Sequence, residues 1–122
     1  MNIISQSTPY SRGQIITGLQ QLIYEMDFVR YGEDFDDDFD GGIWTSGEHD
    51  WIFKGLPPFD HSVEYGELPL TDSGYPYHNA ENFKVKDMYV DGIHREIHDW
   101  LEERGWYPEW YDGGTLLLLK ND

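Results

Sequence analysis

The chain has 122 residues, the length of one ordinary domain, and it carries 24 acidic side chains against 8 basic ones, a net charge of −16. That charge argues against direct binding to nucleic acid or to acidic lipid, and it favours a basic protein partner. The 16% content of aromatic residues predicts a packed core rather than a disordered chain, and the absence of cysteine excludes disulfides and thiolate metal sites.

The N-terminal part of the chain is predicted to hold one helix followed by an acidic loop. Ser11 and Gln14 have the spacing of a capping box, and apolar residues then recur at helical intervals, which predicts a helix over about residues 12–28. Gly32 is expected to end this helix. An acidic loop is predicted to follow over residues 32–42.

The middle of the chain is predicted to hold a short hairpin and a long irregular segment. Residues 43–45 and 51–54 are rich in strand formers, and we expect them to pair with each other. Prolines and glycines then recur over residues 55–82, which favours irregular structure with one strand at 62–65.

A second helix is predicted over residues 91–104, where apolar side chains fall on one stripe. A start as early as Lys86 is the alternative, and Gly105 is the expected stop.

Residues 106–111 and 115–120 are predicted to form a hairpin, in which a glycine of the turn 112–114 supplies a positive φ. Residues 116–119 are apolar on both faces, so we expect a central or covered strand. The order of these elements predicts an α+β fold: a single small domain whose mainly antiparallel sheet of about four strands packs against two helices.

The acidic loop is the main candidate site, because residues 33–40 hold six carboxylates and no basic side chain. Asp36, Asp38 and Asp40 occupy the first, third and fifth places of an EF-hand-like calcium loop, but its twelfth place is Gly47 instead of a glutamate. These three aspartates are therefore only weak metal candidates. A solvated loop, or a ridge that imitates phosphates, is the preferred interpretation, and no cofactor is expected.

Two histidines and four aromatic residues offer weaker signals. His94 and His98 stand four apart and suit one helix face, so they are a possible zinc pair. Half-packed boundary residues are the commoner explanation. On the strand 106–111, alternation places the two tryptophans on one face and the two tyrosines on the other. One of these faces is expected to pack on the helices, and the other is a candidate aromatic interface. For the possible zinc pair of His94 and His98, a third ligand would have to come from a carboxylate or from His49, His61 or His78.

Sequence motifs of enzymes are missing from the chain, which has no phosphate-binding glycine loop and no nucleophile elbow. We therefore expect a protein that is not an enzyme. Residues 1–12 lack the basic start and apolar stretch of a signal peptide, and no apolar run is long enough to span a membrane, so a cytoplasmic protein is expected.

In type, though in no residue-by-residue motif, the chain resembles the small acidic inhibitors that phages and mobile elements make against host defence, such as anti-CRISPR and anti-restriction proteins. Its charge equals that of about eight base pairs of duplex. The resemblance implies a nucleic-acid mimic that occupies the basic surface of a defence nuclease or its surveillance complex in the host cytoplasm, without binding nucleic acid or membrane itself. The candidate partner-binding residues are Asp34, Asp36, Asp37, Asp38, Asp40, Glu48, Asp50, Glu96, Asp99, Glu102 and Glu103.

Two other classes of protein remain open. The first is a small calcium-binding or generic protein-interaction module, and the second, with less support, is an acidic hydrolase.

Overall fold

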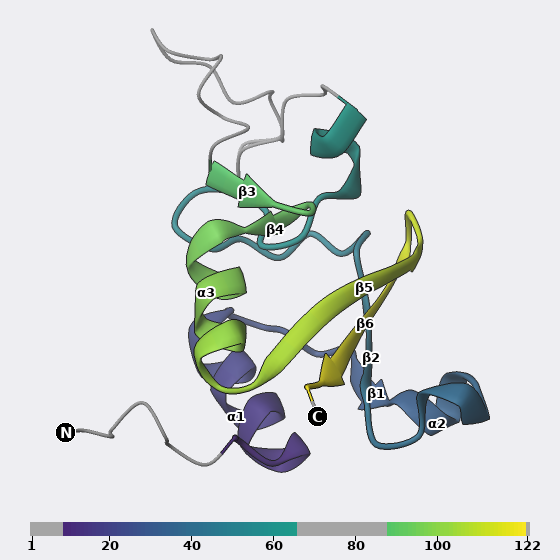
Figure 1. Cartoon of the computed structure of the whole chain (residues 1–122). Helices are drawn as coiled ribbons and strands as arrows, with labels where there is room; N and C mark the ends of the chain where they lie inside the picture. Colours follow the sequence, from purple (N-terminus) through teal and green to yellow (C-terminus); the bar gives the residue numbers. More distant parts are fainter. Residues whose placement is uncertain (1–8, 66–87, 122) are drawn as a thin grey trace, which may run out of the picture.

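A four-stranded antiparallel sheet organises the residues that the computed structural model describes, 9–65 and 88–121 (Figure 1). Its strand order is β1-β2-β6-β5, and every neighbouring pair is antiparallel. The predicted α+β fold with a mainly antiparallel sheet is therefore confirmed. The strands are β1 (Val29–Tyr31), β2 (Ile43–Ser46), β5 (Trp106–Asp112) and β6 (Thr115–Lys120).

The strand β6 is central, as its apolar sequence predicts. It pairs with β2 on one side, where Leu117 lies opposite Trp44, and with β5 on the other, where Leu117 lies opposite Glu109. Leu116 and Leu118 point into the main core, and Leu117 points to the other face, yet all three are fully buried. Both faces of the sheet are therefore covered along this strand.

Two helices cover one face of the sheet. The helix α1 (Arg12–Leu22) contributes Ile15 and Leu19 to the core, and α3 (Arg95–Glu103) contributes Ile97 and Leu101. These side chains pack with core residues of three strands: Ile43, Trp106, Leu116 and Leu118.

The first helix begins at the predicted capping box but ends earlier than predicted. Ser11 accepts a hydrogen bond from the Gln14 backbone, and the Gln14 side chain accepts one from the Ser11 backbone. After Leu22 the chain turns, with Glu25 at a φ of 60°. Residues 23–28, predicted as the last turns of the helix, are not helical, and residues 29–31 after them pair with β2.

The second helix begins later than predicted, at Arg95. The residues before it form a two-stranded sheet, β3 (Tyr89–Val90) and β4 (Ile93–His94). Between the two strands, Asp91 and Gly92 both have positive φ, as a two-residue hairpin turn requires. Lys86, the alternative start, lies outside the described residues.

Three local predictions from the sequence are wrong. Strand β2 pairs with β1 and β6, whereas residues 51–54 form only an isolated bridge between Phe53 and Leu56, so the predicted hairpin does not exist. In the central sheet β2 pairs along both edges, over three positions with β1 and over four with β6, whereas a hairpin with residues 51–54 would pair only one edge. The predicted strand 62–65 lies in a 3-10 helix, η3 (His61–Tyr65). The rest of the predicted irregular segment, from residue 66 to 82, lies outside the described residues.

The third correction concerns the turn between β5 and β6. Neither Gly113 nor Gly114 has a positive φ. The Asp112 carboxylate instead accepts a hydrogen bond from the Gly114 backbone at 3.0 Å, next to a bulge between Trp110 and Asp112. A side-chain acceptor thus closes the turn in place of a left-handed glycine.

The predicted acidic loop lies against the second face of the sheet. It folds into a short helix α2 (Gly32–Phe35) and a 3-10 turn η2 (Asp37–Phe39), and it lies well away from α3 in Figure 1. None of the helices in the two described ranges has the length and apolar character that crossing a membrane needs.

Candidate functional site

The acidic loop, residues 32–42, is closed on itself by backbone hydrogen bonds. The Gly32 N–H donates to the Gly42 carbonyl at 2.8 Å, and the Gly42 N–H donates to the Phe39 carbonyl at 2.9 Å. Within the loop, the Asp36 carboxylate accepts a hydrogen bond from the Asp38 N–H at 2.9 Å and so caps η2. The charges of the loop are therefore held on an ordered turn of chain.

Two phenylalanines fasten the acidic loop to the sheet. The Phe35 ring lies 5.2 Å from the Trp44 ring and 4.9 Å from the Tyr111 ring, and the Phe39 ring lies 6.4 Å from Tyr111. Because these rings face the sheet, the aspartates between them face solvent. These two phenylalanines stand four residues apart within a run of acids, so the sequence itself carries a signal for this packing. A prediction based on charge alone does not detect it.

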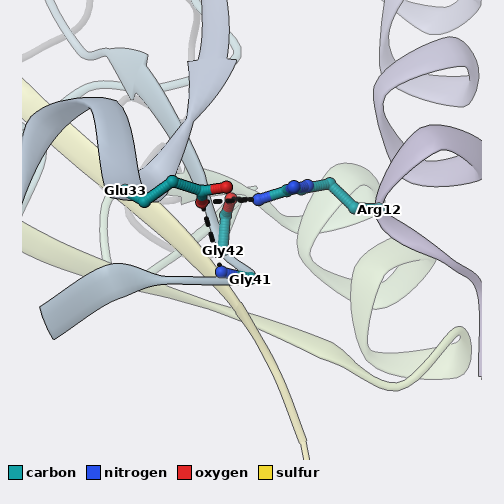
Figure 2. Close-up of polar contacts among 4 residues, drawn as sticks. All are labelled: Arg12, Glu33, Gly41 and Gly42. Carbon is teal, nitrogen blue, oxygen red and sulfur yellow. Dashed lines mark hydrogen bonds and ion pairs between the residues drawn. The ribbon is translucent and has the colours of Figure 1, made fainter. Parts of the chain in front are cut away.

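Arg12 ties the acidic loop to α1 (Figure 2). Its guanidinium donates to Glu33 Oε1 at 2.7 Å and to the Gly42 carbonyl at 3.1 Å, and Glu33 Oε1 also accepts from the Gly41 N–H at 3.2 Å. The hydrogen bond from Arg12 is the main cause that lowers the pKa of Glu33 to about 2. The guanidinium also lies 3.8 Å from the centroid of the Tyr31 ring.

The other five acids of the loop present their charge to solvent. All five are exposed, and within residues 9–65 and 88–121 none of them is ion-paired with a basic side chain. Glu33 is the one member of the run that an arginine neutralises. We name the five exposed residues the acidic ridge: Asp34, Asp36, Asp37, Asp38 and Asp40.

The predicted extension of the ridge through Glu48 and Asp50 lies beyond the far end of β2. Both residues are exposed, but all of β2 separates them from the acidic loop. Glu48 lies against Gly114 in the β5–β6 turn. Asp50 borders a separate shallow hollow, whose other lining residues are Glu25, Asp27, His49 and Trp51.

The predicted second row of acids, on α3, lies on the opposite face of the sheet from the acidic ridge. Glu96 pairs with Lys54 at 2.6 Å, and this contact lowers the pKa of Glu96. Glu103 lies 3.5 Å from Arg104. The structure therefore spreads the predicted partner-binding residues over three places: the acidic loop, the region beyond β2, and α3. Among the described residues, only two α3 acids have no lysine or arginine partner, Asp99 and Glu102.

His94 and His98, the weaker candidate for a zinc pair, do not both lie within α3. His94 precedes α3 and caps it, because its Nδ1 accepts a hydrogen bond from the Glu96 N–H at 3.2 Å. His94 is buried beside Phe53, and burial lowers its imidazole pKa. Of the proposed third ligands, His49 stacks on Trp51 with 4.5 Å between ring centroids, and His78 lies outside the described residues.

Metal-binding groups do not assemble in the described part of the chain, where no three side chains of His, Asp or Glu are placed to hold an ion. In the loop that resembles an EF-hand, the Asp36 carboxylate caps η2, and Ile43 already belongs to β2. The weak calcium candidates Asp36, Asp38 and Asp40 thus belong to a turn that packs on the sheet.

The closure of the acidic loop can be tested at Gly32. A Cβ at this position would overlap the Phe39 carbonyl oxygen and approach the Gly42 carbonyl carbon to 3.1 Å. We expect Gly32→Ala to destabilise the protein by about 1–3 kcal/mol, which lowers the melting temperature by roughly 4 °C per kcal/mol.

The matched control for this variant is Gly13→Ala, because a Cβ at Gly13 has open space around it within α1. This variant should raise stability by up to about 1 kcal/mol. Equal melting temperatures for the two variants in a calorimetric scan would show that the loop is not closed in this way.

The ion pair of Glu33 predicts a pH dependence of stability. Its pKa is lowered from 4.5 to about 2 in the folded protein, so its contribution is complete above about pH 4.5 and is lost as the pH falls towards 2. We expect Glu33→Gln to melt below the wild type at pH 7, and the difference to shrink as the pH falls through this window.

Asp37→Asn is the control, because it removes the same charge from an exposed side chain without an ion pair. Its melting temperature relative to the wild type should not decrease at pH 7. A deficit of Glu33→Gln that stays constant from pH 7 to pH 2 would contradict the role of the Arg12–Glu33 pair.

Comparison of the chain with known protein families, with curated proteins and with solved structures finds no match. A function for this chain has therefore to be inferred from the charge and geometry of its own residues.

Proposed function

We propose that this chain is an acidic, nucleic-acid-mimicking inhibitor that occupies the basic DNA- or RNA-binding surface of another protein. The observation that carries the proposal is the acidic ridge: five exposed aspartates, none of them ion-paired within the described residues, on a loop that hydrogen bonds and aromatic packing hold in place. It acts by stoichiometric binding and not by catalysis.

The order of the acidic loop favours binding. A flexible acidic segment would lose conformational entropy when it docked, whereas this loop has already lost that entropy during folding. The negative charge of the whole chain adds a long-range attraction to a basic surface, which accelerates encounter and weakens as salt rises. A basic nucleic-acid channel would both accept the ordered acidic loop and attract the negative charge of the whole chain, because it binds a dense row of negative charges in its normal function.

The class of partner follows from this chemistry. The proposed partner is a nucleic-acid-binding protein or complex such as a host defence nuclease, and the proposed setting is the cytoplasm of a cell invaded by a phage or mobile element. The chain itself binds neither nucleic acid nor membrane in this proposal, because its negative surface repels phosphates.

The proposal predicts that charge on the acidic ridge matters more than net charge. Replacing Asp36, Asp37, Asp38 and Asp40 together by Asn keeps side-chain size and removes four charges. Stability should hold or rise slightly, because self-repulsion falls. The association rate with a basic nuclease should fall and depend less on salt, because the ridge steers the encounter.

A matched control removes four exposed charges elsewhere, through Glu48→Gln, Asp50→Asn, Asp99→Asn and Glu102→Gln. Both variants and the wild type are compared by their ability to displace fluorescent duplex DNA from basic nucleases, which are first isolated by pull-down from bacterial lysate at two salt concentrations. The control should compete nearly as well as the wild type. Equal losses in the two variants would show that the ridge has no special role, and a mobility shift of DNA by the wild type alone would contradict the proposed function.

A further inference from the structure

The edge strand β5 presents two tyrosines beside the acidic loop. Tyr107, Glu109 and Tyr111 alternate with Trp106, Pro108 and Trp110, and the contacts of Tyr111 with Phe35 and Phe39 place them on the side of the sheet that carries the acidic loop. Tyr107 is 39% exposed and Tyr111 is 60% exposed, and Glu109 between them is exposed as well. We name these three residues the tyrosine stripe. Two aromatic rings with a carboxylate between them form an open surface at the edge of the sheet.

The tyrosine stripe contacts the acidic loop at Tyr111. Phe35 and Phe39 of the loop both meet the Tyr111 ring edge-on, at interplanar angles of 77° and 89°. These contacts orient the ring while most of the tyrosine stays exposed. Tyr111 is therefore the member of the tyrosine stripe that contacts the acidic loop.

The protein itself shows how such groups hold an arginine. The Arg12 guanidinium lies 3.8 Å from the centroid of the Tyr31 ring while it donates to Glu33 at 2.7 Å. A ring face and a carboxylate thus bind one guanidinium together. Arg104 also lies over an aromatic ring, that of Trp100, at 4.5 Å.

We propose that the tyrosine stripe docks arginine side chains of the partner's basic surface in preference to lysines. This inference rests on the proposed function, because the partner is the same basic protein, and the negative charge of the chain complements it. A guanidinium is planar and weakly hydrated, so it stacks on a tyrosine and forms a two-pronged pair with a carboxylate. An ammonium is a compact, strongly hydrated charge that gains less from the ring.

The edge of β5 suits binding through its side chains better than pairing with an added strand of the partner. Pro108 occupies the middle of β5 and has no N–H to donate to an incoming backbone. The side chains of Tyr107, Glu109 and Tyr111 remain as the contact surface.

The experiment compares binding of two peptides, nine arginines and nine lysines, to the full chain by calorimetry at moderate salt. The wild type should bind the arginine peptide several-fold more tightly, since each exposed ring contributes about twofold to fivefold. Tyr107→Leu combined with Tyr111→Leu should remove the preference for arginine, because arginine binding should fall much more than lysine binding. Tyr107→Phe combined with Tyr111→Phe keeps both rings and should retain the preference.

Two further measurements separate this inference from the proposed function. The variant Tyr107→Leu alone leaves the contacts of Phe35 and Phe39 with Tyr111 intact, and it should still lose part of the preference for arginine. The variant with four Asn in the acidic ridge should bind both peptides more weakly while it keeps the preference. Equal binding of the two peptides by the wild type overturns the inference and leaves the proposed function standing. Failure to bind either peptide overturns both.

Discussion

Repulsion among the six carboxylates of residues 33–40 is the constraint that the rest of this structure has to satisfy. A pair of like charges 4 Å apart costs about 1 kcal/mol in water, and in a run of acids the repulsion energies of several such pairs add up. Full burial of a phenylalanine contributes about 1.5–3 kcal/mol, and partial burial contributes less. The packing of Phe35 and Phe39 on the sheet, together with the Arg12–Glu33 pair, is therefore of the size needed to hold the acids together.

The acids on the two faces of the sheet differ in how many of them are paired with basic side chains. On α3, Glu96 and Glu103 lie within 4 Å of Lys54 and Arg104, which screen part of their charge. On the acidic loop, the only ion pair within the described residues belongs to Glu33. Five unpaired aspartates thus lie on the face that also exposes Tyr107 and Tyr111. This coincidence is the structural basis for treating that face as the binding surface.

Local signals in the sequence predicted the elements whose partners are close in the chain. The capping box at Ser11 and the hairpin of β5 and β6 depend on contacts over a few residues, and both are present. The Asp91-Gly92 dipeptide is a strong local hairpin signal too, but the prediction of a helix from residue 91 overlooked it. The wrong partner predicted for β2 has a different origin, because one of its two true neighbours, β6, lies about seventy residues further along the chain.

The sequence by itself determined that this protein is acidic, that it folds as an α+β domain and that its acids cluster in one loop, because charge and periodicity are properties of the chain. Only the tertiary structure decided which acids act together. It separated the acids of α3 from the acidic ridge by placing them on opposite faces of the sheet, and it brought Tyr111 against Phe35 across more than seventy residues. Such proximity depends on strand order and packing, which cannot be deduced from the spacing of residues along the chain.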